Sequence, residues 1–123
     1  MAELKRAVAI LIVENGKILA INKGNVDPLS YALVGGKCNT GESFEDAAIR
    51  ELKEEAGLDA YDMELVFEEP EGAYIVQTFV PRHYYGDICS SNEGEIMWIT
   101  PDELLAGTYS DYNRGVLQKV GMV

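Results

Sequence analysis

The chain has 123 residues, 47% of them hydrophobic and 25% charged, and this fits one globular domain, residues 1–123, with a real core. Its net charge of −11 disfavours binding along a nucleic-acid polymer, because such binding requires positive charge to neutralise phosphates. The longest apolar run, residues 7–13, is too short to cross a membrane, and the first residues lack the pattern of a signal peptide. Cys38 and Cys89 form neither a CxxC pair nor a disulfide framework, so we expect a cytoplasmic protein.

The first part of the chain is typical of β-structure. Residues 4–15 are rich in β-branched and aliphatic side chains and predict a strand, and Asn15-Gly16 is a pair favoured in tight hairpin turns. The expected elements that follow are a partner strand at 17–23, a loop at 24–30, and a short strand at 31–34 that ends at Gly35 and Gly36.

A helix is predicted at residues 44–56. Ser43 followed by Asp46 is typical of a helix start, and Gly57 is typical of a helix end. At about 100° per residue, the apolar side chains at positions 44, 48, 52 and 56 form a stripe that we expect to pack against a sheet.

The second half of the chain predicts more strands and two further helical segments. Strands are expected at 63–69, 73–81 and 95–100, a short helical turn at 101–107, and a last helix, weakened by Gly115, at 111–120. This order indicates a mixed sheet with helices on its faces, which is an α/β fold.

Three glutamates crowd one side of the predicted helix 44–56: Glu51, Glu54 and Glu55. Like charges at spacings of three and four residues repel by about 0.2–0.5 kcal/mol for each exposed pair. Arg50 is spaced to pair with Glu54, whereas Glu51 and Glu55 have no basic partner in the helix at such spacings. Two interpretations are open at this point: a solvated acidic face, or a site for a hard cation such as Mg²⁺ or Mn²⁺, which prefers oxygen ligands.

The residues around this cluster match a known pattern. After Gly36 come five residues and Glu42, seven more and Arg50-Glu51-Leu52, one more and Glu54-Glu55, and one more and Gly57-Leu58. The segment 36–58, "GKCNTGESFEDAAIRELKEEAGL", therefore resembles the Nudix box at every fixed position. By this resemblance the chain is identified as a small MutT-type member of the Nudix hydrolase superfamily.

The resemblance implies a fold and an activity. The Nudix fold is an α/β/α sandwich with a mixed central sheet, in which the box forms a loop–helix–loop. Its enzymes use Mg²⁺ or Mn²⁺ to cleave a nucleoside diphosphate linked to another group X, and they release a nucleoside monophosphate and P–X. A cation would neutralise phosphate oxygens and lower the pKa of the attacking water, while a glutamate takes the proton.

The resemblance also assigns roles by position. Glu51, Glu54 and Glu55 correspond to the acids that hold metal and activate water, with Glu51 and Glu55 favoured as ligands and the identity of the base left open. Arg50 corresponds to the arginine that orients these acids, and a structural salt bridge accompanies that role. The remaining expected positions are Glu42 in the same network, the carbonyl of Gly35 as a metal ligand, Gly36 and Gly57 as structural glycines, and Glu93 as either a further ligand or a surface acid.

Candidate substrate-binding residues lie outside the box. Asn113 matches the place where an asparagine reads a purine edge in MutT-type enzymes, and a helix cap is the alternative. Lys23 is either a phosphate contact or an exposed lysine. Tyr74 and Phe79 either stack on a base or belong to the core. Val34 stands where many members carry proline, and we expect this to affect the loop rather than the chemistry.

The short chain favours a (deoxy)nucleoside triphosphate or an oxidised purine nucleotide as the substrate, cleaved to the monophosphate and pyrophosphate. The alternatives are a nucleotide sugar or ADP-ribose, a dinucleoside polyphosphate (suggested weakly by the position of Tyr74), and a non-catalytic nucleotide-binding module on the same fold. The expected partner is thus a small nucleotide and not a nucleic-acid polymer or a membrane, and the chain fits a monomer or a homodimer.

Overall fold

The computed structural model describes residues 4–22, 24 and 30–123. Within these residues the elements are, in chain order, β1 (Lys5–Ile10), β2 (Val13–Glu14), β3 (Lys17–Asn22), β4 (Ala32–Lys37), α1 (Phe44–Ala56), β5 (Asp59–Glu71), β6 (Tyr74–Tyr85), β7 (Glu95–Ile99), α2 (Pro101–Leu105) and α3 (Ser110–Lys119). The predicted α/β class is confirmed, and the helix expected at 44–56 has those bounds.

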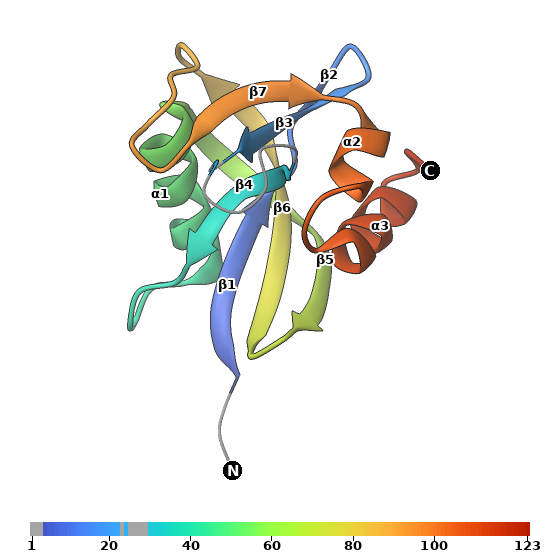
Figure 1. Cartoon of the computed structure of the whole chain (residues 1–123). Coiled ribbons are helices and arrows are strands. Elements are labelled where there is room, and N and C mark those ends of the chain that lie inside the picture. The colour runs from blue at the N-terminus through green and yellow to red at the C-terminus, as the bar shows by residue number, and fades with distance from the viewer. Residues whose placement is uncertain (1–3, 23, 25–29) are drawn as a thin grey trace.

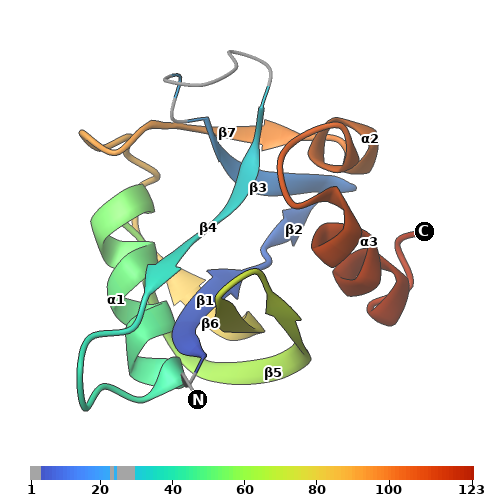
Figure 2. The ribbon, with the colours of Figure 1, turned by 60° about the horizontal axis from the view of Figure 1, so that its bottom comes forward.

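The strands form one mixed, curled sheet in the order β2-β3-β4-β1-β6-β5, with β7 pairing with β3. β1 and β6 run parallel, while the pairs β1–β4, β2–β3, β3–β4, β3–β7 and β5–β6 are antiparallel. Helix α1 lies on one side of the sheet, and α2 and α3 lie on the other (Figures 1 and 2). The helices therefore cover both faces, as in a sandwich.

The core is divided by the sheet into two hydrophobic clusters. Strand β3 contributes to both, because successive side chains of a strand point to opposite faces. Leu19 and Ile21 join the cluster beneath α1, whereas Ile18 and Ala20 join the cluster beneath α2 and α3. Because both faces of β3 are covered, its four central residues, 18–21, are all hydrophobic and buried.

Local capping explains why α1 begins and ends where it does. The Ser43 side chain accepts a hydrogen bond from the backbone N–H of Asp46, and Gly57 adopts a left-handed conformation with φ of 77° while its N–H bonds the Lys53 carbonyl. The buried face of the helix is wider than the predicted stripe, since it includes Ala47, Glu51 and Glu55 as well. Two glutamates thus face the sheet instead of solvent.

Some strands differ from their predicted bounds. The segment expected as one strand at 4–15 is divided into β1 and β2, because the chain changes partners: β1 pairs with β4 and β6, and β2 pairs with β3. β5 and β6 are longer than predicted and form a long hairpin whose turn includes Gly72, with φ of 59°. β4 continues through Gly35 and Gly36 to Lys37. The loop expected at 24–30 lies largely outside the described residues.

Gly115 positions α3 against β5. A Cβ atom at Gly115 would lie 2.5 Å from Cζ of Phe67, closer than side chains normally approach. Phe67 also packs edge-on against Tyr112 of α3, with ring centroids 5.2 Å apart. The glycine costs helix propensity, about 1 kcal/mol relative to alanine, but it lets the helix approach the strand closely.

We predict that Gly115→Ala destabilises the protein by about 1–2 kcal/mol, because overpacking against Phe67 outweighs the gain in helix propensity. Urea denaturation measures this change. In a Phe67→Ala background the clash is absent, and the same substitution should be neutral or stabilising. A stabilising effect in the wild-type background would contradict this account of the α3–β5 contact.

Candidate active site

Three carboxylates meet at one end of the sheet. Glu51, Glu55 and Glu93 each offer an oxygen, and these oxygens all lie within 4.8 Å of one another. Glu51 and Glu55 are one turn apart on α1 and are 7% and 1% exposed, whereas Glu93 is exposed in the segment before β7. Buried carboxylates at such a distance repel, and a hard divalent cation that prefers oxygen ligands would remove the repulsion. This donor set therefore fits a divalent-cation site.

The two glycines of β4 make room for this cluster. The Gly35 N–H donates a 2.8 Å hydrogen bond to Glu55 Oε1. A Cβ at Gly36 would lie 2.5–2.7 Å from the carboxyl atoms of Glu51, and a Cβ at Gly35 would lie 2.1 Å from the Val8 carbonyl oxygen on β1. Both positions therefore require glycine, one for the glutamate of α1 and the other for the neighbouring strand. A role of the Gly35 carbonyl as a metal ligand stays a prediction.

Arg50 holds the surrounding acids in place. Its Nε and Nη2 donate to the two oxygens of Glu42 at 2.8 and 3.0 Å, and its Nη1 donates to Glu51 Oε1 at 2.8 Å and to Glu54 Oε2 at 3.1 Å. Nη2 also donates to the Lys37 carbonyl. The expectation that Glu51 has no basic partner in the helix is therefore wrong. Neighbouring helix positions do not normally face each other, but the long arginine side chain turns toward β4 and reaches the adjacent residue.

Burial and Arg50 act on these acids in different directions. The hydrogen bonds from Arg50 chiefly lower the pKa of Glu42, to about 2. Burial raises the pKa of Glu51, and the hydrogen bond and charge of Arg50 oppose that rise. Glu54 is different, because its side chain is 49% exposed and it lies outside the group of three. Its metal-binding and catalytic roles stay predictions, with a pairing to Arg50 as its observed contact.

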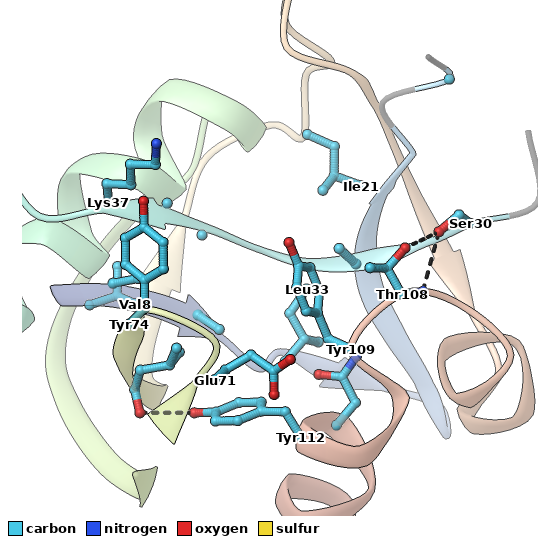
Figure 3. Close-up of a pocket in the computed structure, with 18 residues that line it drawn as sticks. Val8, Ile21, Ser30, Leu33, Lys37, Glu71, Tyr74, Thr108, Tyr109 and Tyr112 are labelled. Atoms are coloured by element: carbon cyan, nitrogen blue, oxygen red, sulfur yellow. Dashed lines mark hydrogen bonds between the residues drawn. The ribbon is translucent and has the colours of Figure 1, made fainter. Parts of the chain in front are cut away.

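A cavity of about 480 Å³ begins at the same glycines and extends to α3. Gly35 and Gly36 of β4 and Asn113 of α3 line it, and Lys37, Tyr74 and Tyr109 contribute to the walls (Figure 3). Its volume is within the range of small-molecule sites, about 300–1,000 Å³. The carboxylate cluster and the cavity therefore share one segment of β4.

The candidate substrate residues differ in where the structure puts them. Asn113 is 3% exposed, and among the described residues nothing accepts a hydrogen bond from its Nδ2. It lies inside α3, whose N-cap is Tyr109, so the alternative of a helix cap is wrong. Tyr74 lines the cavity, and Lys37 Nζ lies 5.7 Å from its ring centroid. Phe79 belongs to the hydrophobic cluster beneath α1, as the core interpretation expects. Lys23 lies outside the described residues.

Two further residues of the cavity carry no signal in the sequence. Glu71 is the last residue of β5, and Tyr109 precedes α3 with φ of 65°, a left-handed conformation that is uncommon for a bulky residue. Neither belongs to a motif. They reach the cavity because the β5–β6 hairpin and the start of α3 both lie along it, which depends on the tertiary fold.

Comparison with known proteins identifies the family. Residues 3–120 match the NUDIX domain family. A Nudix hydrolase of Bacillus subtilis, YvcI, is 31% identical over 80% of this chain and 67% of its own length. The oxidized purine nucleoside triphosphate hydrolase of Danio rerio is 29% identical over 81% of this chain and 69% of its own. The crystal structure of a MutT Nudix hydrolase from Burkholderia pseudomallei superposes with a TM-score of 0.78 at 22% identity, over 97% of this chain and 99% of that one.

The chain therefore belongs to the Nudix family, and it is a Nudix hydrolase, a pyrophosphohydrolase. The resemblance of the segment 36–58 to the Nudix box and the predicted fold are confirmed. Nudix enzymes typically depend on metal, and the glutamate cluster has the donors for one. No helix among the described residues is long and apolar enough to span a membrane.

We predict that Gly36→Ala weakens divalent-cation binding at least tenfold, because the added Cβ displaces the carboxylate of Glu51. Titration calorimetry with Mn²⁺ measures the affinity. Thermal unfolding without metal should change little, since the clash is with a side chain that can rotate away. An unchanged Mn²⁺ affinity would show that cation binding does not depend on the position that the Glu51 carboxylate occupies beside Gly36.

The Glu42–Arg50 pair should make stability depend on acid pH. The pKa of Glu42 is about 2 in the folded protein and about 4.3 in an unfolded chain, so its contribution is fully present above about pH 4.3 and is lost as the pH falls toward 2. We predict that Glu42→Gln reduces the loss of stability between pH 5 and pH 2.5, roughly the window these pKa values define. Urea midpoints at several pH values measure this, and the exposed Glu45→Gln provides the control. Equal pH dependence in wild type and Glu42→Gln would contradict the assignment.

Proposed function

We propose that the protein is a Mg²⁺- or Mn²⁺-dependent hydrolase of nucleoside triphosphates, which it cleaves to the nucleoside monophosphate and pyrophosphate. The observation that carries the proposal is the shared segment Gly35–Gly36. This segment contacts the carboxylates of Glu51 and Glu55, and it also lines the cavity to which Asn113 contributes. A nucleotide can therefore place its phosphates at the acidic cluster and its base at α3.

The proposed metal ligands are Glu51, Glu55 and Glu93, with Glu54 and the Gly35 carbonyl as further candidates. A bound cation would neutralise phosphate oxygens and lower the pKa of the attacking water. Arg50 then acts as a positioning residue, because it fixes Glu51 through a 2.8 Å hydrogen bond. A glutamate of the cluster serves as the base, and the exposed Glu54 has the freedom to approach the water.

The cavity residues support nucleotide binding. The buried Asn113 Nδ2 can donate a hydrogen bond to an acceptor on a base edge, and an unpaired buried donor favours a ligand that pairs with it. Tyr74 offers an aromatic face, and Lys37 beside it offers positive charge for phosphate. Lys23 remains a candidate phosphate contact. We further propose a single cytoplasmic domain, 1–123, that acts as a monomer or homodimer.

The chain is similar to the Danio rerio enzyme whose name gives oxidized purine nucleoside triphosphates as its substrate. Purine nucleoside triphosphates are therefore the first substrates to test. The panel should contain the four nucleoside triphosphates, 8-oxo-dGTP, a nucleotide sugar, ADP-ribose and a dinucleoside polyphosphate, each with Mg²⁺ and with Mn²⁺. Product identification shows which bond is cleaved. Binding without turnover across the whole panel would favour the alternative of a nucleotide-binding module.

We predict that Glu55→Gln and Glu93→Gln each lower kcat at least about a hundredfold, because each removes a charged ligand of the cation. Glu95→Gln is the matched control, since Glu95 is an exposed acid two residues from Glu93 and lies outside the group of three. Chelation with EDTA should abolish turnover, and added Mg²⁺ or Mn²⁺ should restore it. Turnover that survives Glu55→Gln would overturn the site assignment.

A further inference from the structure

The end of the cavity near α3 contains a carboxylate that the proposed hydrolysis does not use. Glu71 is the last residue of β5 and lines the cavity together with Asn113. Its carboxylate points into the cavity on the side of Tyr109 and Tyr112 (Figure 3). Within the part of the chain that the structure describes, no hydrogen bond or ion pair engages it. Its neighbours Glu68 and Glu69 are exposed and do not line the cavity.

A carboxylate and an amide N–H in one pocket define a specific hydrogen-bonding requirement. The two oxygens of a carboxylate accept hydrogen bonds from two adjacent donors, as they do from the forked N–H groups of arginine. Asn113 Nδ2, buried and without an acceptor among the described residues, requires an acceptor. The complementary ligand therefore presents an acceptor and two donors along one edge.

Guanine carries this arrangement on its Watson–Crick edge. O6 is an acceptor, and N1–H and the 2-amino group are adjacent donors. Adenine places one donor beside an acceptor, uracil places one donor between two acceptors, and cytosine has one donor beside two acceptors. Hypoxanthine differs from guanine only in lacking the 2-amino group. The edge is the same in guanine and in its 8-oxo derivative, so oxidation at C8 is a separate question.

We propose that Glu71 selects guanine nucleotides, by accepting hydrogen bonds from N1–H and the 2-amino group while Asn113 Nδ2 donates to O6. This inference rests on the proposed nucleotide hydrolysis and adds the base to it. The selection is a matter of binding, because Glu71 lines the cavity and is not part of the carboxylate group of Glu51, Glu55 and Glu93.

The test compares GTP with ITP, in whichever sugar form the enzyme turns over faster. The wild-type kcat/KM for GTP should exceed that for ITP about tenfold or more, because removing the 2-amino group costs one of the two hydrogen bonds to a charged carboxylate. Glu71→Gln should lower kcat/KM for GTP more than for ITP, because ITP loses only the charge of the N1–H acceptor, so that the ratio falls to about threefold or less. The loss should appear in KM with kcat retained, as expected for a contact made equally in the ground and transition states.

Glu69→Gln is the matched control, since it makes the same change of charge two residues away on β5 and outside the cavity. It should keep the wild-type ratio of GTP to ITP. Equal turnover of GTP and ITP by the wild type, or an unchanged ratio in Glu71→Gln, would overturn the proposal. A loss of the ratio in Glu69→Gln as well would also overturn it, because general electrostatics would then explain the preference.

Binding of GMP and IMP, measured by calorimetry without metal, separates this proposal from the proposed hydrolysis. Wild type should bind GMP about tenfold more tightly than IMP, and Glu71→Gln should bind both alike. If no nucleotide is hydrolysed but the GMP preference depends on Glu71, the hydrolysis proposal fails and this inference stands. If triphosphates are hydrolysed and GMP and IMP bind equally, only the inference about Glu71 fails.

Discussion

The burial of Glu51 and Glu55 between α1 and β4 is the constraint on which the rest of the site depends. Transferring two carboxylates from water into a protein interior costs several kcal/mol each unless they are paired. Gly35 N–H pairs with Glu55, and Arg50 pairs with Glu51. The position of Glu51 requires a strand without a side chain at Gly36, since a Cβ there would occupy the space of its carboxyl group, while Gly35 allows β4 to approach β1 closely. Gly36 is therefore a structural condition for the buried carboxylate of Glu51.

One arginine does not neutralise the acids around it. Arg50 is shared among Glu42, Glu51 and Glu54, and of these three Glu42 accepts two of its hydrogen bonds. Two further carboxylates, Glu55 and Glu93, lie near Glu51. The site thus gathers several carboxylates around one guanidinium. A bound cation would add positive charge and would also reverse the local sign, which would allow a chain of net charge −11 to bind the phosphates of the proposed substrate.

Sequence reasoning succeeded where structure depends on local chemistry and failed where it depends on tertiary contacts. Capping residues predicted α1 to the residue, and the spacing from Gly36 to Leu58 predicted the family. The partner of Glu51 was missed because helix spacing rules consider residues three and four positions apart. They do not describe an arginine that turns toward β4 and reaches the adjacent residue. The length of the β5–β6 hairpin followed from pairing between strands, and Glu71 enters the cavity only through that hairpin.

The two ends of the site follow different physical rules, and this separates chemistry from specificity. At the β4 end, charges are crowded and buried, so the identity of each side chain is fixed by electrostatics and by close packing. At the α3 end, Asn113 and Glu71 lie in a cavity wide enough for a base, and a change there alters which edge is accepted without disturbing the carboxylate cluster. Since Gly35 and Gly36 adjoin the carboxylates and also line the cavity, a nucleotide bound there would meet both sets of residues at once. The base can therefore be selected by residues that never contact the phosphates, as long as β4 holds the distance between them.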